Sequence, residues 1–159
     1  MNKYNQMFRF TNALLAIMPE SIELQWDRTI LLERMADVAL MEGNIPEALN
    51  LFQESISLKE KMFETANQKK EMRNSRSWDE RRIAFAKSCT CFARICRSRR
   101  LFHEAAATLQ KIIVVLKMDE FYEEKKQAEQ LLQDSYQILD EILSWENWSQ
   151  SSDQKKNKP

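Results

Sequence analysis

The chain has 159 residues, 43% of them hydrophobic and 30% charged, and its 24 acidic and 24 basic side chains leave no formal net charge. These values are typical of one soluble globular domain and exclude a disordered polymer. One glycine and three prolines are too few for a turn-rich sheet protein or a glycine-rich phosphate loop. Good helix formers fill most of the rest, which predicts an all-α fold.

Six helices are predicted in chain order, beginning with residues 3–17 and about 20–42, in which many apolar residues recur at three- and four-residue steps. Gly43 is placed to end the second helix in a left-handed conformation. Asn44 is placed to cap the third helix, which is predicted to run to about residue 72.

A polar stretch at 73–77 predicts a loop before the fourth helix at about 78–97, and a turn at 98–100 precedes the fifth. The sixth helix is predicted at 119–146, and the polar residues 149–159 are predicted to form a disordered tail. The sixth helix has this apolar set: Ala128, Leu131, Leu132, Tyr136, Leu139 and Leu143.

No apolar run approaches the roughly 20 residues that a membrane-spanning helix needs, and the first residues show no apolar signal segment. The three cysteines are odd in number and lie close together at Cys89, Cys91 and Cys96. This pattern favours free thiols in a reducing compartment over a disulfide framework. We therefore expect no membrane association and a cytoplasmic location, with the nucleus as the alternative.

The hairpin formed by the second and third helices carries a recognisable pattern. Nearly all the signature positions of a tetratricopeptide repeat hold a suitable residue: Ala36, Gly43-Asn44, Glu47-Ala48, Phe52 and Ser55. The sequence therefore resembles this family, in which a small residue lets helix A pack closely on helix B. The resemblance implies antiparallel hairpins that stack into a short superhelix with a concave groove for a partner peptide.

A second, weaker copy of the pattern lies 57 residues later, counted from Gly43 to Arg100. The family spacing is about 34 residues. Arg100 also stands where the family prefers glycine, and Ile112 stands where it prefers a small residue. Matching residues of this copy are Cys89, Phe92, Ala93, Cys96, Phe102, Ala105 and Leu109.

The resemblance implies a domain of residues 1–148, with repeats at about 29–62 and 86–117 and a capping helix at 119–146. A generic helical bundle whose hairpins match the pattern by chance is the alternative. Two repeats are fewer than the three that such arrays usually need. The end helices or another subunit must then cover the open ends, which makes a homo-oligomer a second expectation.

Catalytic and metal chemistry find little support in the sequence. His103 is the one histidine, and it has no partner at helical spacing that would make a metal site. Cys89 and Cys96 share one helix face with two phenylalanines, as small core residues would. We expect no enzyme activity, no metal and no cofactor.

Charge is distributed in three blocks: ten acidic and four basic residues at 20–64, eleven basic and three acidic at 69–100, and nine acidic and two basic at 119–146. In the basic block, steps of three and four residues put four polar residues on one helix face. By the resemblance this face lines the groove, and two further arginines extend it at the turn. The predicted partner-binding set is Lys87, Thr90, Arg94, Arg97, Arg99 and Arg100.

Arginine pairs bind carboxylates well, so the predicted partner is a protein with an acidic peptide segment. The alternative is that these cations form only a solvated surface. Glu33 and Asp37 occupy the groove-lining positions of the first repeat, so the groove would be acidic at one end and would repel a carboxylate there.

Two further interpretations stay open. Residues 69–100, with Trp78 nearby, could bind nucleic acid, although the acidic flanks would repel a polyanion. Trp145 and Trp148 could pack against the domain as a cap or could lie exposed as an anchor for a partner.

Overall fold

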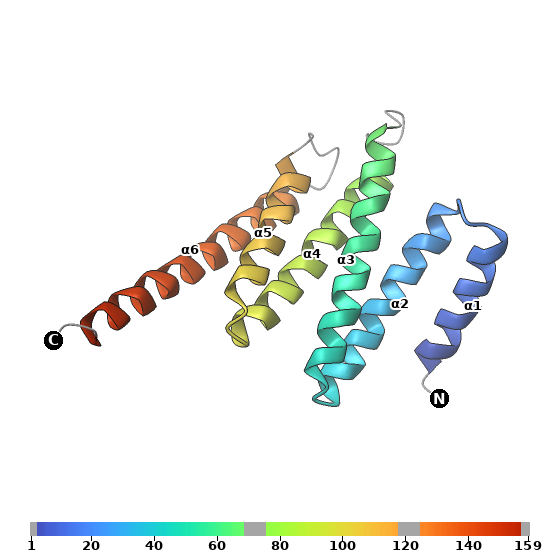
Figure 1. The fold of residues 1–159 in the computed structure, drawn as a ribbon. Coiled ribbons are helices and arrows are strands. Elements are labelled where there is room, and N and C mark those ends of the chain that lie inside the picture. The colour runs from blue at the N-terminus through green and yellow to red at the C-terminus, as the bar shows by residue number, and fades with distance from the viewer. Residues whose placement is uncertain (1–2, 69–75, 118–124, 157–159) are drawn as a thin grey trace. The chain divides into compact units, whose positions relative to one another are not determined.

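The computed structural model describes residues 3–68, 76–117 and 125–156, and in these residues all regular structure is helical. The predicted all-α fold with six helices is confirmed over this part of the chain (Figure 1). The helices are α1 (Lys3–Ile17), α2 (Ile22–Met41), α3 (Ile45–Gln68), α4 (Arg76–Ser98), α5 (Phe102–Lys117) and α6 (Lys125–Lys156).

The chain divides into two compact units, Met1–Trp78 and Asp79–Pro159. In the first unit α2 packs against both α1 and α3, and in the second α5 packs against α6. The predicted loop at 73–77 lies mainly outside the described residues, and its last two residues, Arg76 and Ser77, lie inside α4.

The turn between α2 and α3 has the predicted geometry. Gly43 has a φ of 76°, and the backbone N–H of Asn44 donates to the carbonyl oxygen of Ala39 at 2.8 Å. The Asn44 side chain accepts from the N–H of Glu47 at 3.4 Å. The left-handed residue and the N-cap therefore satisfy backbone groups that the two helix ends would otherwise leave unpaired.

The turn between α4 and α5 repeats this geometry without a glycine. Arg100 has a φ of 61°, and the N–H of Leu101 donates to the carbonyl oxygen of Cys96 at 2.9 Å. Both acceptor and donor lie 57 residues after their counterparts in the first turn. The left-handed conformation costs a non-glycine residue about 1–2 kcal/mol, so packing of the flanking helices must stabilise this turn.

The buried residues of the two hairpins correspond at the same offset. Each hairpin has buried alanines in both of its helices. Buried pairs separated by 57 positions are Leu32 and Cys89, Ala36 and Ala93, Ala39 and Cys96, Ala48 and Ala105, Phe52 and Leu109, and Ser55 and Ile112.

Helix α6 differs from its prediction in both length and register. It continues to Lys156, so residues 149–156 of the expected tail are helical, and no glycine or proline interrupts them. Residues 157–159 and the expected start at Asp119 lie outside the described residues. Ala128 is buried as predicted, whereas Tyr136 and Leu143, predicted on the same side, are 41% and 53% exposed. The buried side continues instead through Ser135, Ile138 and Ile142, at helical spacing.

Candidate functional site

Helix α4 displays most of the predicted cations on one side of the second unit. Lys87 and Arg94 are exposed and, like Arg99 and Arg100 at its end, have no ion pair within the described part of the chain. A cation without a carboxylate partner is available to an anionic ligand at little desolvation cost. These four side chains are therefore the accessible members of the predicted set.

Arg97 and Thr90 are already engaged. The Arg97 guanidinium is 38% exposed and bonds to the Glu141 carboxylate of α6. Thr90 is buried, and its hydroxyl donates to the carbonyl oxygen of Ala86 at 2.9 Å. Arg97 thus links α4 to α6, whereas Thr90 has no hydroxyl proton left for a partner.

Next to Arg97, helix α6 contributes an acidic and aromatic side. Tyr136 and Trp145 are 41% and 56% exposed, and with Asp140 and Glu141 they line a shallow hollow on this helix. Trp145 is therefore exposed, whereas the side chain of Trp148 lies outside the described residues. We define the α4–α6 surface as Lys87, Arg94, Arg97, Tyr136, Asp140, Glu141 and Trp145.

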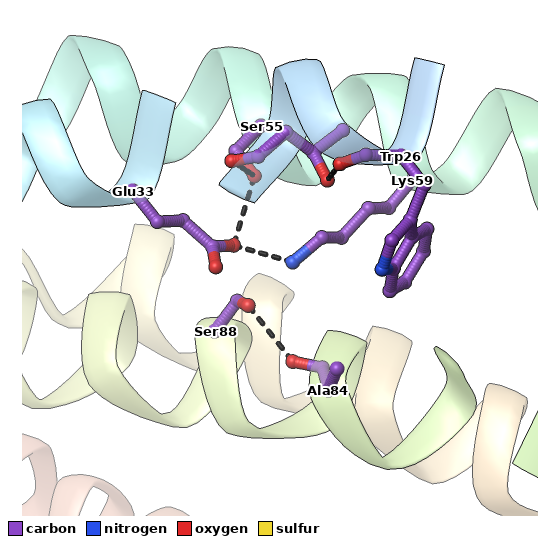
Figure 2. A network of polar contacts seen from close by, with 7 residues as sticks. Trp26, Glu33, Ser55, Lys59, Ala84 and Ser88 are labelled. Carbon is purple, nitrogen blue, oxygen red and sulfur yellow. Dashed lines mark hydrogen bonds and ion pairs between the residues drawn. The ribbon is translucent and has the colours of Figure 1, made fainter. Parts of the chain in front are cut away.

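The two acidic residues predicted in the first unit are not free carboxylates. Glu33 lies 2.8 Å from the Ser55 hydroxyl and 2.5 Å from the Lys59 ammonium group (Figure 2). Asp37 pairs with Arg34 at 3.4 Å. The expected acidic end of a groove is therefore neutralised locally in the first unit.

Lys59 is the polar residue that sequence reasoning missed. It is 1% exposed, and besides pairing with Glu33 its ammonium lies 5.1 Å from the centre of the Trp26 ring (Figure 2). A buried charge needs such partners to offset its loss of hydration. The available signal was its position four residues after Ser55, on the apolar side of α3. A second contact in Figure 2, from the Ser88 hydroxyl to the Ala84 carbonyl, lies within α4.

The cysteines and the histidine separate into buried and exposed groups. Cys89 and Cys96 are buried, as predicted for small core residues, whereas Cys91 and His103 are exposed. Burial, with a smaller effect of Glu104, raises the pKa of the Cys96 thiol to about 11. This thiol is therefore protonated at neutral pH and is a poor nucleophile.

Among residues 3–68, 76–117 and 125–156, no cluster of three or more His, Cys, Asp or Glu side chains is arranged to hold a metal ion. No helix of that same part combines the length and the apolar character of a membrane span.

No family model, curated protein or solved structure matches the chain. The tetratricopeptide resemblance therefore stays an inference from the residues themselves. The 57-residue correspondence is a separate finding, because it compares two parts of this one chain by their turns and buried positions.

Proposed function

We propose that the chain is a non-enzymatic adaptor of the tetratricopeptide-like class, which holds an acidic peptide or helix of a partner protein on the α4–α6 surface. The observation that carries this proposal is the pair of exposed cations Lys87 and Arg94 on one face of α4. The end of this helix is joined through Arg97 and Glu141 to α6, on which Tyr136 and Trp145 are exposed.

The chemistry of this surface suits a peptide that combines carboxylates with an apolar or aromatic side chain. Lys87 and Arg94 are seven residues apart, about two helical turns or 10 Å, so they can contact two different carboxylates of a bound segment. Exposed ion pairs of this kind contribute up to about 1 kcal/mol each. Trp145 supplies apolar area of the type found at the energetic centres of interfaces.

A nucleic-acid partner is the second candidate, and two observations in the basic block weigh against it. Trp78 is 5% exposed and packs edge-on against Phe63 with ring centres 5.0 Å apart, so its ring face is not offered to a base. Arg82 is 4% exposed and pairs with Asp79, which removes it from contact with phosphates.

The proposal is tested by selecting peptides from a random display library on the full chain and measuring their affinity by fluorescence anisotropy. We expect acidic residues to be enriched among the selected peptides. The double variant Lys87→Glu/Arg94→Glu should weaken their binding at least about tenfold, because about 1.4 kcal/mol corresponds to a factor of ten.

The matched control is Lys125→Glu/Lys126→Glu, which makes the same charge change at two exposed lysines at the start of α6. Equal losses in both variants would mean a nonspecific charge effect and would contradict the proposal. Saturable binding of single-stranded RNA that is lost with Lys87→Glu/Arg94→Glu, together with no acidic enrichment, would favour the nucleic-acid function instead.

A further inference from the structure

A pocket of about 420 Å³ lies within the first unit, between the α1–α2 connection, α2, α3 and Trp78. This volume lies in the range of pockets that hold small-molecule ligands. The walls are largely apolar, and the polar lining side chains come from the α1–α2 connection, α2 and α3. Apolar residues of the lining are Leu15, Pro19, Ile22, Leu58, Met62 and Trp78.

Arg28, which also lines the pocket, is held in place by two neighbours. Its guanidinium carbon lies 5.6 Å from the centre of the Phe8 ring, and its Nη2 atom donates to Glu54 at 2.8 Å. Its Nε atom is buried and has no hydrogen-bond acceptor among the described residues. A buried donor left without an acceptor costs about 1–3 kcal/mol, so the hydrogen bonding of this guanidinium is incomplete.

Lys61 adds a second cation to the lining, on the exposed side of α3, and has no ion pair within the described residues. The negative charge in the lining is the exposed carboxylate of Glu20. The side-chain amide of Gln25, also in the lining, donates to the carbonyl oxygen of Pro19 at 2.6 Å. Within the lining two cations thus face one carboxylate beside apolar walls, and Glu54, the partner of Arg28, lies outside the lining. This balance favours an anionic head group over a cationic one.

We propose that this pocket binds a small amphiphilic carboxylic acid. The apolar part of the ligand contacts Leu58, Met62 and Trp78, and its carboxylate accepts hydrogen bonds from Arg28 and Lys61. Because Phe8 and Glu54 already fix the guanidinium, the ligand loses little affinity to the ordering of this side chain. The site is separate from the α4–α6 surface, and the proposal does not depend on the proposed function.

Isothermal titration of the full chain with decanoate and with decylammonium tests the proposal, because the two probes each have ten carbons and differ in the sign of the head group. We expect saturable binding of one decanoate at an affinity at least about tenfold higher than that of decylammonium, the factor that about 1.4 kcal/mol provides. Equal or tighter binding of decylammonium would overturn the proposal, as would the absence of saturable decanoate binding.

Two variants locate the binding. Lys61→Met should weaken decanoate binding about two- to fivefold, as the loss of one exposed charge contact does, whereas the control Lys3→Met changes an exposed lysine outside the pocket and should leave it unchanged. Thr65→Trp fills the pocket from an exposed position of its lining and should abolish binding while circular dichroism shows a folded chain. Unchanged binding to a folded Thr65→Trp variant would place the ligand elsewhere and refute the site.

Discussion

The hairpins α2–α3 and α4–α5 have the same turn geometry but differ in the residues of their interiors. The left-handed turn residue, the turn hydrogen bonds and the buried alanines recur after 57 residues. At the equivalent interior positions the first hairpin has Glu33, Ser55 and Lys59, and the second has Thr90, Ile112 and Leu116.

This difference shows which features the hairpin requires. Small residues where the helices meet and a left-handed turn are present in both copies, so they are the shared structural requirement. The buried ion pair between Glu33 and Lys59 occurs only in the first copy. An ion pair between these two positions is therefore not a condition for forming the hairpin.

The largest expected effect comes from truncating the large side chain that each hairpin buries at the same position. Phe52→Ala should lower the free energy of unfolding by about 3–5 kcal/mol and Leu109→Ala by about 2–5 kcal/mol, because each leaves a cavity. Urea unfolding followed by circular dichroism measures both. Gln53→Ala and Gln110→Ala, at equivalent exposed positions one residue later, should change stability by less than about 0.5 kcal/mol. If only one of Phe52→Ala and Leu109→Ala lowered the free energy of unfolding, the two positions would not be structurally equivalent.

The polar interior can be exchanged for that of the other hairpin. Glu33→Thr and Lys59→Leu should each destabilise the chain by about 1–3 kcal/mol, because each leaves a partly or fully buried group without its main partner. The double variant, which carries the residues of the second hairpin, should lie within about 1 kcal/mol of the wild type. Additive losses in the same urea titrations would show that the ion pair is not the source of the effect.

Substitutions at the left-handed residues of the two turns should have smaller effects on stability, of opposite sign. Gly43→Ala should cost about 1 kcal/mol, and Arg100→Gly should stabilise by up to about 1 kcal/mol, since only glycine adopts a positive φ without strain. A Cβ atom at Gly43 would meet nothing within 4 Å, so the cost is conformational and not steric. Opposite shifts of the urea midpoint are expected, and a destabilising Arg100→Gly change would contradict the shared turn geometry.

The smallest effect at neutral pH is that of Cys96→Ala, because Ala39 stands at the equivalent position of the first hairpin. Burial raises the pKa of this thiol from 9.0 to about 11, so the folded state favours the protonated form. Its contribution to stability is then complete below pH 9.0 and is lost as pH rises toward about 11. The wild type should lose more stability than Cys96→Ala between these two pH values in urea titrations, and parallel losses would rule out this thiol as the cause.

Much of the fold was predictable because local rules determine it. The bounds of α1, the left-handed conformation of Gly43 and the cap at Asn44 follow from proline, glycine and capping chemistry close in sequence. The side of α6 that is buried could not be predicted in the same way. Tyr136 and Ile138 are both apolar, and only packing decides which one is buried.

The candidate surface was predicted in part. Helical spacing correctly brought Lys87 and Arg94 to one exposed side, but it could not show that Thr90 is buried or that Arg97 pairs with Glu141. The residues of that ion pair are 44 positions apart, so they meet only through tertiary packing. The pocket near Trp78 could not be predicted from the sequence either, because its lining residues, from Leu15 to Trp78, meet only through tertiary packing.

The most direct test of the account is a paramagnetic label on Cys91, which is exposed on α4 between Lys87 and Arg94. The buried Cys89 and Cys96 should not react with the labelling reagent under native conditions. If a selected acidic peptide lies on the α4–α6 surface, its NMR signals should broaden strongly with this label and little with the same label on the Lys87→Glu/Arg94→Glu variant. Equal broadening in both proteins, or none in the wild type, would contradict the proposed binding surface.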